Sequence, residues 1–572
     1  MLRLFWKNML NPKICFCKNI VFTIRFAVSD KMRIFAQVTT TSFLRTFNKR
    51  INMENNTLKR LPVGIQTFSE VIGRDCLYVD KTEYICKMLQ LSKYIFLSRP
   101  RRFGKSLLVS MLQSYFEGRK ELFKGLYIDT VEKEWTPYPV LRFSLASAKF
   151  TDAEQLKRYL GSMLEREETK WGITSPKKDA NDRLSDLIIK AHTQTGREVV
   201  VLIDEYDAPL LDVSHKAALL EDMRQIMRNF YSPLKDCDPH LHFVFLTGIT
   251  KFSQLSIFSE LNNLKNISMM PEFAAICGMS EEEVRGQMPD YLDNFGSIKN
   301  MSREQALAAL KRQYDGYHFA WPSPDIFNPF SLLNALQDRK LRSYWFESGT
   351  PTFLIEKLRE FNISPSMLCK TNAMASSFDA PTENMTSVIP LLYQGGYFTI
   401  KDYDEVTDLY VLDVPNKEIR IGLMESLLPN YVKIDSYKGM TTVGLMYRAL
   451  YEDNLDGMLR QLQSYLLTIP YCDNTNYEGH YQQLLYVIFT LLGRYVDVEV
   501  HTPTGRVDMV MNSGKAIYLF ELKLDKSADA AMQQIELKDY ASKFALSGLP
   551  VVRVGISFDA ERRTIGEWKI EA

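Results

Sequence analysis

The stretch SRPRRFGKSLL, residues 98–108, contains the end of a phosphate-binding loop but lacks its beginning. Its GKS matches the last three positions of the motif G-x-x-x-x-G-K-[ST], whereas Arg99 stands where the first glycine belongs. The apolar run KYIFLS (93–98) before the loop predicts a buried strand, and the apolar residues after it recur at helical spacing. The stretch is therefore either a nucleotide site with an altered loop or a basic surface turn that contains GKS.

Further strands are predicted on both sides of residue 200, at 140–146, 197–207 and 240–250. They are nearly continuous apolar runs, and amphipathic helices separate them. This pattern predicts a parallel sheet covered by helices on both faces, which places the chain in the α/β class. In such sheets ligands bind beyond the carboxyl ends of the strands, and that is where the polar residues of this sequence fall.

A nucleotide site needs a helix N-terminus facing the phosphates, a lysine that neutralises charge and a hydroxyl that holds Mg²⁺. Lys105 and Ser106 stand where the last two belong. Asp204 and Glu205 follow the strand VVVLI, so we expect Asp204 to share the metal and Glu205 to position the attacking water. Thr247, near the end of another strand, is a candidate for sensing the terminal phosphate, as is Thr250.

The remaining loop residues are predicted to bind the nucleotide as well: Arg99, Arg101, Arg102 and Gly104. The tight turn of such loops favours residues that adopt φ > 0 easily, which is why glycine is usual at the first position. Arg99 must therefore either take part in a different turn or contribute its own charge to the phosphates.

A second group of charged residues lies in GRVDMVMNSGKAIYLFELK (505–523). The strands 506–511 and 516–524 are predicted to form a hairpin across a Ser-Gly turn. Glu521 and Lys523 are two residues apart on one strand and so share a face, and Asp508 on the partner strand can lie beside them. Two acids and a lysine in this arrangement suit a divalent-metal site that cleaves phosphodiesters. The alternative is a surface salt-bridge cluster on a hairpin.

Two more residues are candidates for supporting this second site. Glu478 begins the predicted helix 476–493 and is either a metal ligand or part of a capping box with Thr475. Gln533 lies on the predicted helix 529–545, which precedes a further strand at 551–558. Leu522, between the two charged residues, is expected to point into the core.

The composition is that of an ordinary globular protein, with 46% hydrophobic and 24% charged residues in 572. The net charge is +1, but residues 1–52 contain ten Lys/Arg and one acid, so the rest carries a net −8. An acidic body argues against non-specific coating of nucleic acid. Eight scattered cysteines without a C-x-x-C pair suggest a reducing, cytoplasmic setting, and no stretch predicts a membrane span.

Seven motifs in this chain resemble those of the bacterial AAA-ATPase-like family, which usually carries a C-terminal PD-(D/E)XK nuclease-like domain. The resemblance extends from about Leu61 to the C-terminus, and the family's own loop resembles RPRRFGK[ST], with arginine at the first-glycine position. The motifs are RPRRFGKSL (99–107), VDKTEYI (79–85), VVVLIDEYDAPL (199–210), LTGITKFSQLSIFSELNNL (246–264), YDGYHF (314–319), FNPFSLL (327–333) and LLYQGGYFTI (391–400).

The resemblance implies an α/β protein with a P-loop NTPase (AAA-like) parallel-sheet domain, a mostly helical middle region and a C-terminal α/β PD-(D/E)XK nuclease-like domain. We place the ATPase domain at 53–260, the middle region, with a small β-hairpin at 396–416, at 261–435, and the nuclease-like domain at 436–572. Residues 1–52 are expected to be a non-native or disordered leader. The spacing D-x₁₂-E-x-K from Asp508 to Lys523 matches the nuclease pattern, although Val507 replaces its proline.

The resemblance also implies ATP and Mg²⁺ as ligands, with Lys105 and Ser106 at the phosphates and Asp204 and Glu205 in magnesium binding and hydrolysis. One hypothesis is then an enzyme, an ATPase coupled to a Mg²⁺-dependent nuclease whose metal ligands include Asp508, Glu521 and Glu478. Its partner is nucleic acid, DNA rather than RNA, with no membrane. The alternative is a nucleotide-switched regulatory ATPase whose nuclease-like domain binds nucleic acid or a partner without cleaving. Assembly into a homo-oligomer is left open.

Overall fold

The computed structural model describes most of the chain beyond residue 57. At some element ends, including Glu478 and Asp508, it describes the backbone alone. The expected leader at 1–52 lies outside the described residues. The described ranges are 58–146, 149–213, 216–250, 263–347, 352–363, 365–368, 370–379, 387–431, 436–468, 477–493, 497–501, 508–537, 548–559, 561–562 and 564–572.

Five parallel strands form the first sheet, in the order β2-β3-β4-β1-β5. This confirms the parallel α/β sheet predicted from the apolar runs. Asp204 lies beside Thr247 in the register, and Ser98 lies beside Gly248, so the carboxyl ends of three strands meet at one edge. The strands are β1 (Tyr94–Ser98), β2 (Val140–Ser144), β3 (Val199–Asp204), β4 (Leu241–Gly248) and β5 (Lys265–Asn266).

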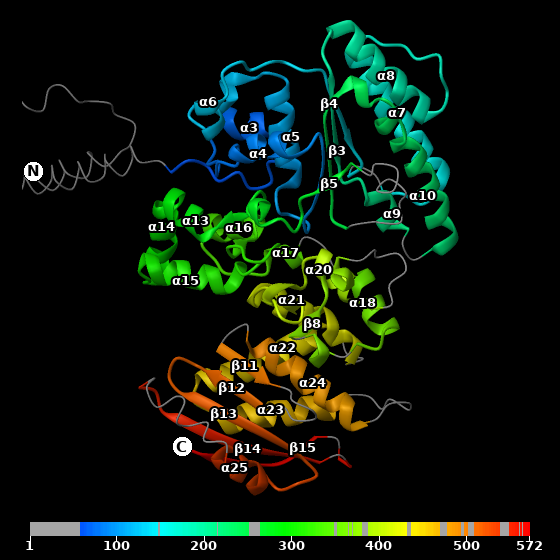
Figure 1. The fold of residues 1–572 in the computed structure, drawn as a ribbon. Helices are drawn as coiled ribbons and strands as arrows, with labels where there is room; N and C mark the ends of the chain where they lie inside the picture. The colour runs from blue at the N-terminus through cyan, green and yellow to red at the C-terminus, as the bar shows by residue number, and fades with distance from the viewer. Residues whose placement is uncertain are drawn as a thin grey trace, which may run out of the picture. The chain divides into compact units, whose positions relative to one another are not determined.

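Helices cover both faces of this sheet (Figure 1). Successive residues of β3 alternate between the faces, as strand geometry requires: Val200 and Leu202 pack in the cluster that contains α5, whereas Val201 and Ile203 pack with α7, α8 and α10. The helices of this part are α3 (Phe68–Gly73), α4 (Glu83–Leu91), α5 (Lys105–Phe116), α6 (Tyr127–Val131), α7 (Ala153–Trp171), α8 (Ala180–Thr195), α9 (Ala208–Asp212), α10 (Ala217–Tyr231) and α11 (Pro233–Asp236).

The middle region is mostly helical, and some of its helices begin at side-chain caps. Ser280 and Ser302 each form a capping box with the residue three positions on, so both orphan amides are satisfied. Its helices are α13 (Glu281–Gln287), α14 (Pro289–Lys299), α15 (Arg303–Tyr314), α16 (Pro329–Asp338), α17 (Tyr344–Glu347), α18 (Thr352–Glu360), α19 (Ala375–Phe378), α20 (Ile389–Gln394) and α21 (Lys417–Tyr431).

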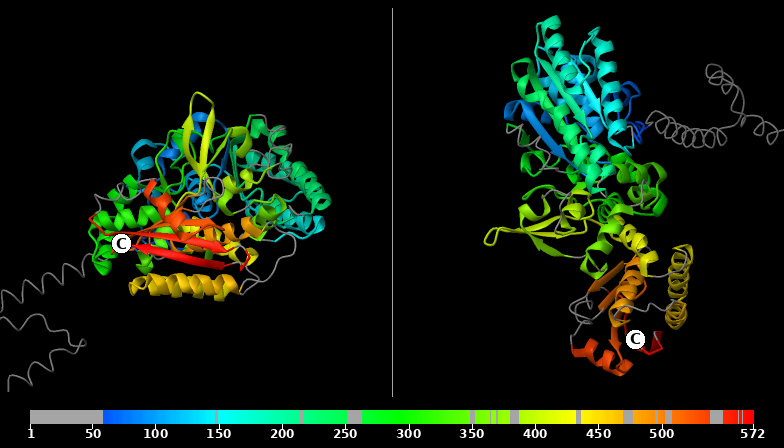
Figure 2. Two further views of the ribbon diagram at one scale, coloured as in Figure 1. Left: turned by 90° about the horizontal axis from the view of Figure 1, so that it is seen from below. Right: turned by 90° about the vertical axis from the view of Figure 1, so that its right-hand side faces the viewer.

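The predicted hairpin of the middle region is present. β9 (Thr399–Asp404) pairs antiparallel with β10 (Leu409–Asp413), and β8 (Thr371–Ala373) joins the other edge of β10. The hairpin extends away from the helices of the middle region (Figure 2). A two-stranded sheet also pairs β6 (Met279–Ser280) with β7 (Ile326–Phe327).

The C-terminal part contains a mixed sheet in the order β11-β12-β13-β14-β15. The helix α25 connects β13 to the parallel strand β14, and the other pairs are antiparallel. Two of its strands, β11 and β15, were not predicted. The elements are α22 (Ser436–Tyr451), α23 (Leu455–Leu467), α24 (Tyr477–Leu492), β11 (Asp497–His501), β12 (Asp508–Asn512), β13 (Ile517–Leu524), α25 (Ala528–Leu537), β14 (Val551–Asp559) and β15 (Thr564–Glu571).

The helix α23 is joined to the last strand by side-chain hydrogen bonds. The Trp568 indole donates to Asp456 Oδ1 at 3.0 Å, and Gln463 Nε2 donates to the Ile565 carbonyl at 2.6 Å. In the part of the chain that the structure describes, no helix is both long and apolar enough to cross a membrane.

Candidate active sites

The loop after β1 contains two residues with positive φ just before α5, Arg102 and Gly104. Gly104 adopts φ 96° immediately before α5, with nothing within 4 Å of where a Cβ would stand, so its conformation rather than crowding requires glycine. Arg102 also has a positive φ, 68°, which is unusual for a residue with a side chain. Arg99, at the position of the missing glycine, is not among the residues with positive φ, so the left-handed turn of this loop lies nearer its end.

Lys105 turns inward at the first turn of α5. Its Nζ donates to the carbonyls of Arg99 and Pro100 at 2.9 and 3.1 Å, and its side chain is buried. Burial lowers the pKa of Lys105, and the nearby carboxylates, Glu205 foremost, act in the opposite direction. The lysine therefore closes the loop from inside and lies close to the acids that follow β3.

Those acids lie at the carboxyl edge of the sheet. Asp204 is buried, and its Oδ1 has no hydrogen-bond partner among the described residues. Glu205 has φ 53°, and burial raises its pKa although Lys105 opposes the shift. An unpaired buried carboxylate oxygen is costly unless a ligand satisfies it, and a divalent cation is such a ligand.

A third acid, Asp207, was not predicted to take part. Its Oδ2 accepts hydrogen bonds from the Thr250 amide, the Thr250 hydroxyl and the Ile249 amide at 2.7, 2.8 and 2.9 Å. Burial raises the pKa of Asp207. It joins the loop after β3 to the end of β4, and Gly248 is needed there because a Cβ would lie 2.5 Å from Asp207 Oδ1.

A cavity of about 1180 Å³ lies over this edge of the sheet. It is large enough for a nucleoside triphosphate, since ordinary small-molecule sites occupy about 300–1,000 Å³. Residues 62–66, the loop and the middle region line it together. Among the predicted site residues, those that line it are Arg101, Arg102, Gly104, Lys105, Ser106, Asp204, Glu205 and Thr250.

Two predicted site residues point elsewhere. The Arg99 guanidinium is buried, 2% exposed, and donates to the carbonyls of Ser268 and Phe273 at 2.8 and 2.9 Å. Burial lowers the pKa of Arg99 to about 10. Thr247 donates its hydroxyl to the Leu97 carbonyl at 2.9 Å, within the sheet. Two alternatives were open for Arg99: part of a turn different from the usual one, or a charge that contacts the phosphates directly. This geometry fits the first.

In the C-terminal sheet, Asp508 on β12 pairs directly with Glu521 on β13 in the backbone register. Lys523 donates to Glu521 Oε1 at 2.8 Å, and both side chains are buried. Leu522 between them is buried in the core, as expected. The side chains of Asp508 and Glu478 lie outside the described residues, and the described side chains form no group of three His, Cys, Asp or Glu that could hold a metal ion.

Gln534, and not the predicted Gln533, is the glutamine that contacts Lys523. Lys523 Nζ donates to Gln534 Oε1, whereas Gln533 is exposed on α25. The helix begins close to the sheet because Gly555 on β14, beside Glu521, has no side chain: a Cβ there would lie 2.6 Å from the Ala528 carbonyl. The glutamine and the glutamate thus hold the lysine amine between the strand and the helix.

The fold and these two groups of residues define a class: an α/β protein that joins an AAA-like P-loop domain to a PD-(D/E)XK-type domain. Two family models match the chain accordingly. Residues 62–258 match a predicted AAA-ATPase, and residues 476–568 match the PD-(D/E)XK nuclease superfamily.

A relative from Azotobacter chroococcum mcd 1, an uncharacterized protein in the vnfD 5' region, is 35% identical over 528 residues, which cover 90% of this chain and 99% of the relative. The chain therefore belongs to the AAA-ATPase-like family with a C-terminal PD-(D/E)XK nuclease-superfamily domain.

Proposed function

We propose that this protein hydrolyses ATP and couples the nucleotide cycle to a Mg²⁺-dependent phosphodiesterase acting on nucleic acid. The observation that carries the proposal is the pairing of Asp508 with Glu521, with Lys523 bonded to Glu521, in a chain that also presents Lys105, Asp204 and Glu205 to a nucleotide-sized cavity. Buried charged side chains at strand ends are expensive and tend to mark function.

At the first site, Lys105 would neutralise the phosphates and Glu205 would orient the attacking water. Arg101 and Arg102 face the same cavity and add positive charge. Ser106 and Asp204 would hold Mg²⁺, and the unpaired Oδ1 of Asp204 fits that role. Bound there, the ion would neutralise charge developing on the phosphates.

At the second site, Asp508, Glu521 and Glu478 would hold the metal, and Lys523 would stabilise negative charge on the scissile phosphate or position water. Glu521 already orients the lysine amine. The sheet brings the two carboxylate-bearing strands together without help from distant parts of the chain.

The partner we propose is DNA rather than RNA, on the basis of the domain pairing. The acidic body of the chain favours a local cleft over general coating of nucleic acid. Scattered cysteines suit a cytoplasmic setting; Cys76, Cys86, Cys237 and Cys277 are free thiols.

The decisive experiment compares the wild type with Lys105→Ala and Asp508→Ala. ATP hydrolysis and Mg²⁺-dependent degradation of DNA and RNA are measured for each. Asp508→Ala should abolish cleavage and leave ATP turnover, and Lys105→Ala should lower ATP turnover about 10²–10³-fold. Asp453→Ala is the matched control, because Asp453 is an exposed acid in the same part of the chain that pairs with Lys515.

A wild type that turns over ATP but cuts neither DNA nor RNA with any divalent metal would contradict the nuclease. It would leave the regulatory alternative, in which the C-terminal domain binds nucleic acid or a partner without cleaving. A wild type that neither binds nor hydrolyses ATP would contradict the first half of the proposal.

A further inference from the structure

The middle region contacts the phosphate loop from outside at successive residues. The Trp345 indole donates to the Arg101 carbonyl at 3.2 Å. The Arg102 guanidinium lies 4.9 Å from the centre of the Phe330 ring. The first contact is made with the backbone of the loop. The second is made with the side chain of Arg102, the residue with positive φ.

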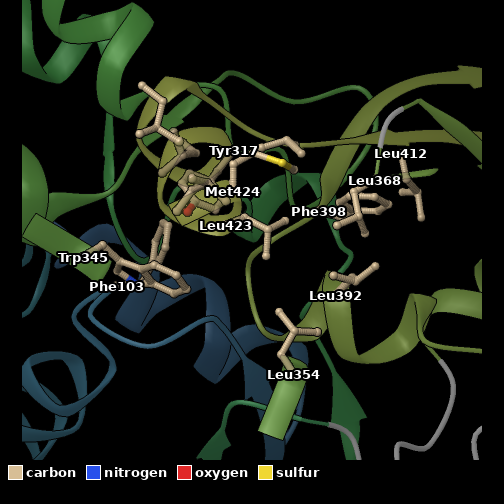
Figure 3. Packing of buried hydrophobic residues seen from close by; sticks show 14 of the residues in the cluster. Phe103, Tyr317, Trp345, Leu354, Leu368, Leu392, Phe398, Leu412, Leu423 and Met424 are labelled. Atoms are coloured by element: carbon tan, nitrogen blue, oxygen red, sulfur yellow. The ribbon is translucent and has the colours of Figure 1, made fainter. Parts of the chain in front are cut away.

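The loop residues on either side are held in the same way. The Arg99 guanidinium lies 4.2 Å from the Phe319 ring centre, and the Phe103 ring makes edge contacts with Tyr317 and Phe319 at 4.8 and 5.2 Å. Figure 3 shows Phe103 beside Trp345, with Tyr317 close to both. The motifs YDGYHF and FNPF, which the nucleotide chemistry does not use directly, therefore supply contacts to the loop.

Gly396 completes this set. It has φ 83°, and a Cβ there would lie 2.6 Å from Pro100 Cβ, so the chain at 395–397 packs closely on the loop. Tyr397 in turn makes an edge contact with Trp345, at 5.2 Å between ring centres. Trp345 is also fixed at its backbone, because its amide donates to Glu418 Oε1 at 2.8 Å.

The need for outside support follows from the loop's own conformation. A left-handed conformation costs an ordinary residue about 1–2 kcal/mol, and Arg102 adopts it. Such strain persists only where the surroundings hold the backbone in place. Inside the loop, the Lys105 amine bonds to two carbonyls, which leaves only the third of its N–H donors for a phosphate.

We infer that Phe330 and Trp345 are positioning residues of the phosphate loop, so that the arrangement of the middle region sets the affinity for nucleotide. The inference rests on the proposed nucleotide site. Phe330 acts through the Arg102 guanidinium, and Trp345 acts through the Arg101 carbonyl. Nucleotide occupancy and the arrangement of α16 and α17 are then coupled in both directions, as linkage requires.

The first test needs no nucleotide. Amide hydrogen exchange of residues 101–108 is measured in the full chain for the wild type, Phe330→Leu and Trp345→Phe. Both substitutions keep an apolar side chain, so the fold should survive while one contact is lost. We expect exchange in this segment to become several-fold faster, because local opening is easier when outside contacts are removed.

Two controls match these substitutions. Trp568→Phe also removes one indole hydrogen bond, and Phe361→Leu also replaces a half-buried ring with a smaller aliphatic side chain. Among the described residues, neither has a hydrogen bond or ring contact with the loop. Exchange at 101–108 that is unchanged in both test variants, or that rises equally in the controls, overturns the inference.

The second test measures ATP affinity by calorimetry. Phe330→Leu should weaken binding about threefold to tenfold, as expected for loss of a cation–π contact, and Trp345→Phe about fivefold, as expected for one hydrogen bond. In an Arg102→Ala background the Phe330→Leu effect should disappear, whereas the Trp345→Phe effect should remain. Additive effects of Phe330→Leu and Arg102→Ala would overturn the route through Arg102.

The two tests separate this inference from the proposed function. If the wild type binds no ATP, the proposed function fails, and the exchange experiment still decides whether the middle region holds the loop. If ATP binds tightly, and the Phe330 and Trp345 variants change neither the exchange rate of the loop nor the affinity for ATP, the proposed function stands and the inference is wrong.

Discussion

The phosphate loop takes its neighbours from segments far apart in the chain, whereas the observed contacts of the C-terminal site come from two adjacent strands and the helix that follows. Lys105 lies close to acids after β3, and the loop around it contacts residues up to Gly396. Asp508, Glu521 and Gln534 fall within one short segment. The first site should therefore respond to changes in many parts of the molecule, and the second mainly to changes within its own sheet.

The largest expected effect comes from Lys105→Ala. It removes the amine that bonds the loop carbonyls and faces the acids, so ATP turnover should fall about 10²–10³-fold, as for loss of a charge-stabilising donor. Steady-state phosphate release measures it. Lys170→Ala, a half-exposed lysine on α7, is the control and should leave the rate unchanged. Turnover that persists in Lys105→Ala would mean that this lysine is not needed for ATP hydrolysis.

Glu205→Gln should lower ATP turnover about 10²-fold, because the amide is a poor base for water. Burial raises the pKa of Glu205, so the reactive carboxylate is lost as pH falls through a value above the usual 4.5. The wild-type rate should therefore decline on the acid side at a higher pH than an ordinary glutamate would give, and the variant should lose that decline. A pH profile of kcat measures both; Glu154→Gln, on the exposed start of α7, should keep the wild-type profile.

Gly396→Ala tests whether a segment far away in the sequence packs closely enough on the phosphate loop to affect stability. The new methyl group would meet Pro100 at 2.6 Å, adding about 1–3 kcal/mol of overpacking to the cost of the left-handed backbone. Gly172→Ala is the matched control, since Gly172 has φ 62° and nothing within 4 Å. Urea unfolding should show a lower midpoint for Gly396→Ala than for Gly172→Ala. Equal midpoints would mean that the close approach of residue 396 to Pro100 adds nothing to the loss of stability.

The smallest effect is expected from a contact that supports Lys523 in the C-terminal site. Gln534→Leu removes the amide oxygen that accepts from Lys523, so the cleavage rate should fall about fivefold, in line with one hydrogen bond. Gln533→Leu changes the neighbouring, exposed glutamine and should have no effect. Rates on one DNA substrate at saturating Mg²⁺ compare the two. A larger loss in Gln533→Leu would favour the sequence prediction over the observed contact.

The local parts of both sites were predictable from sequence. GKS between an apolar run and a helical pattern located Lys105 and Ser106, and period-2 spacing put Glu521 and Lys523 on one face. The same alternation was present in DVEVH, which is β11, and in EWKIE, the end of β15, and could have indicated both strands. Asp207 also had a signal, as the third acid in the run DEYD.

What the sequence could not supply were contacts between distant segments and the phase of one helix. The partners of Arg99 are carbonyls of Ser268 and Phe273, and backbone acceptors leave no trace in residue type. The choice between Gln533 and Gln534 depends on where α25 begins, to within one residue, and helix ends are defined no better than that by pattern.

The packing of Pro100 against Gly396 has a consequence for biosynthesis. A ribosome adds about 5–20 residues per second, so roughly 15–60 s pass between synthesis of the loop and synthesis of the segment that packs on it. During that interval the emerging ATPase domain has to fold with its phosphate loop incomplete. Under the proposed function, nucleotide would therefore stabilise the complete loop only late in synthesis, after the segment around Gly396 has been made.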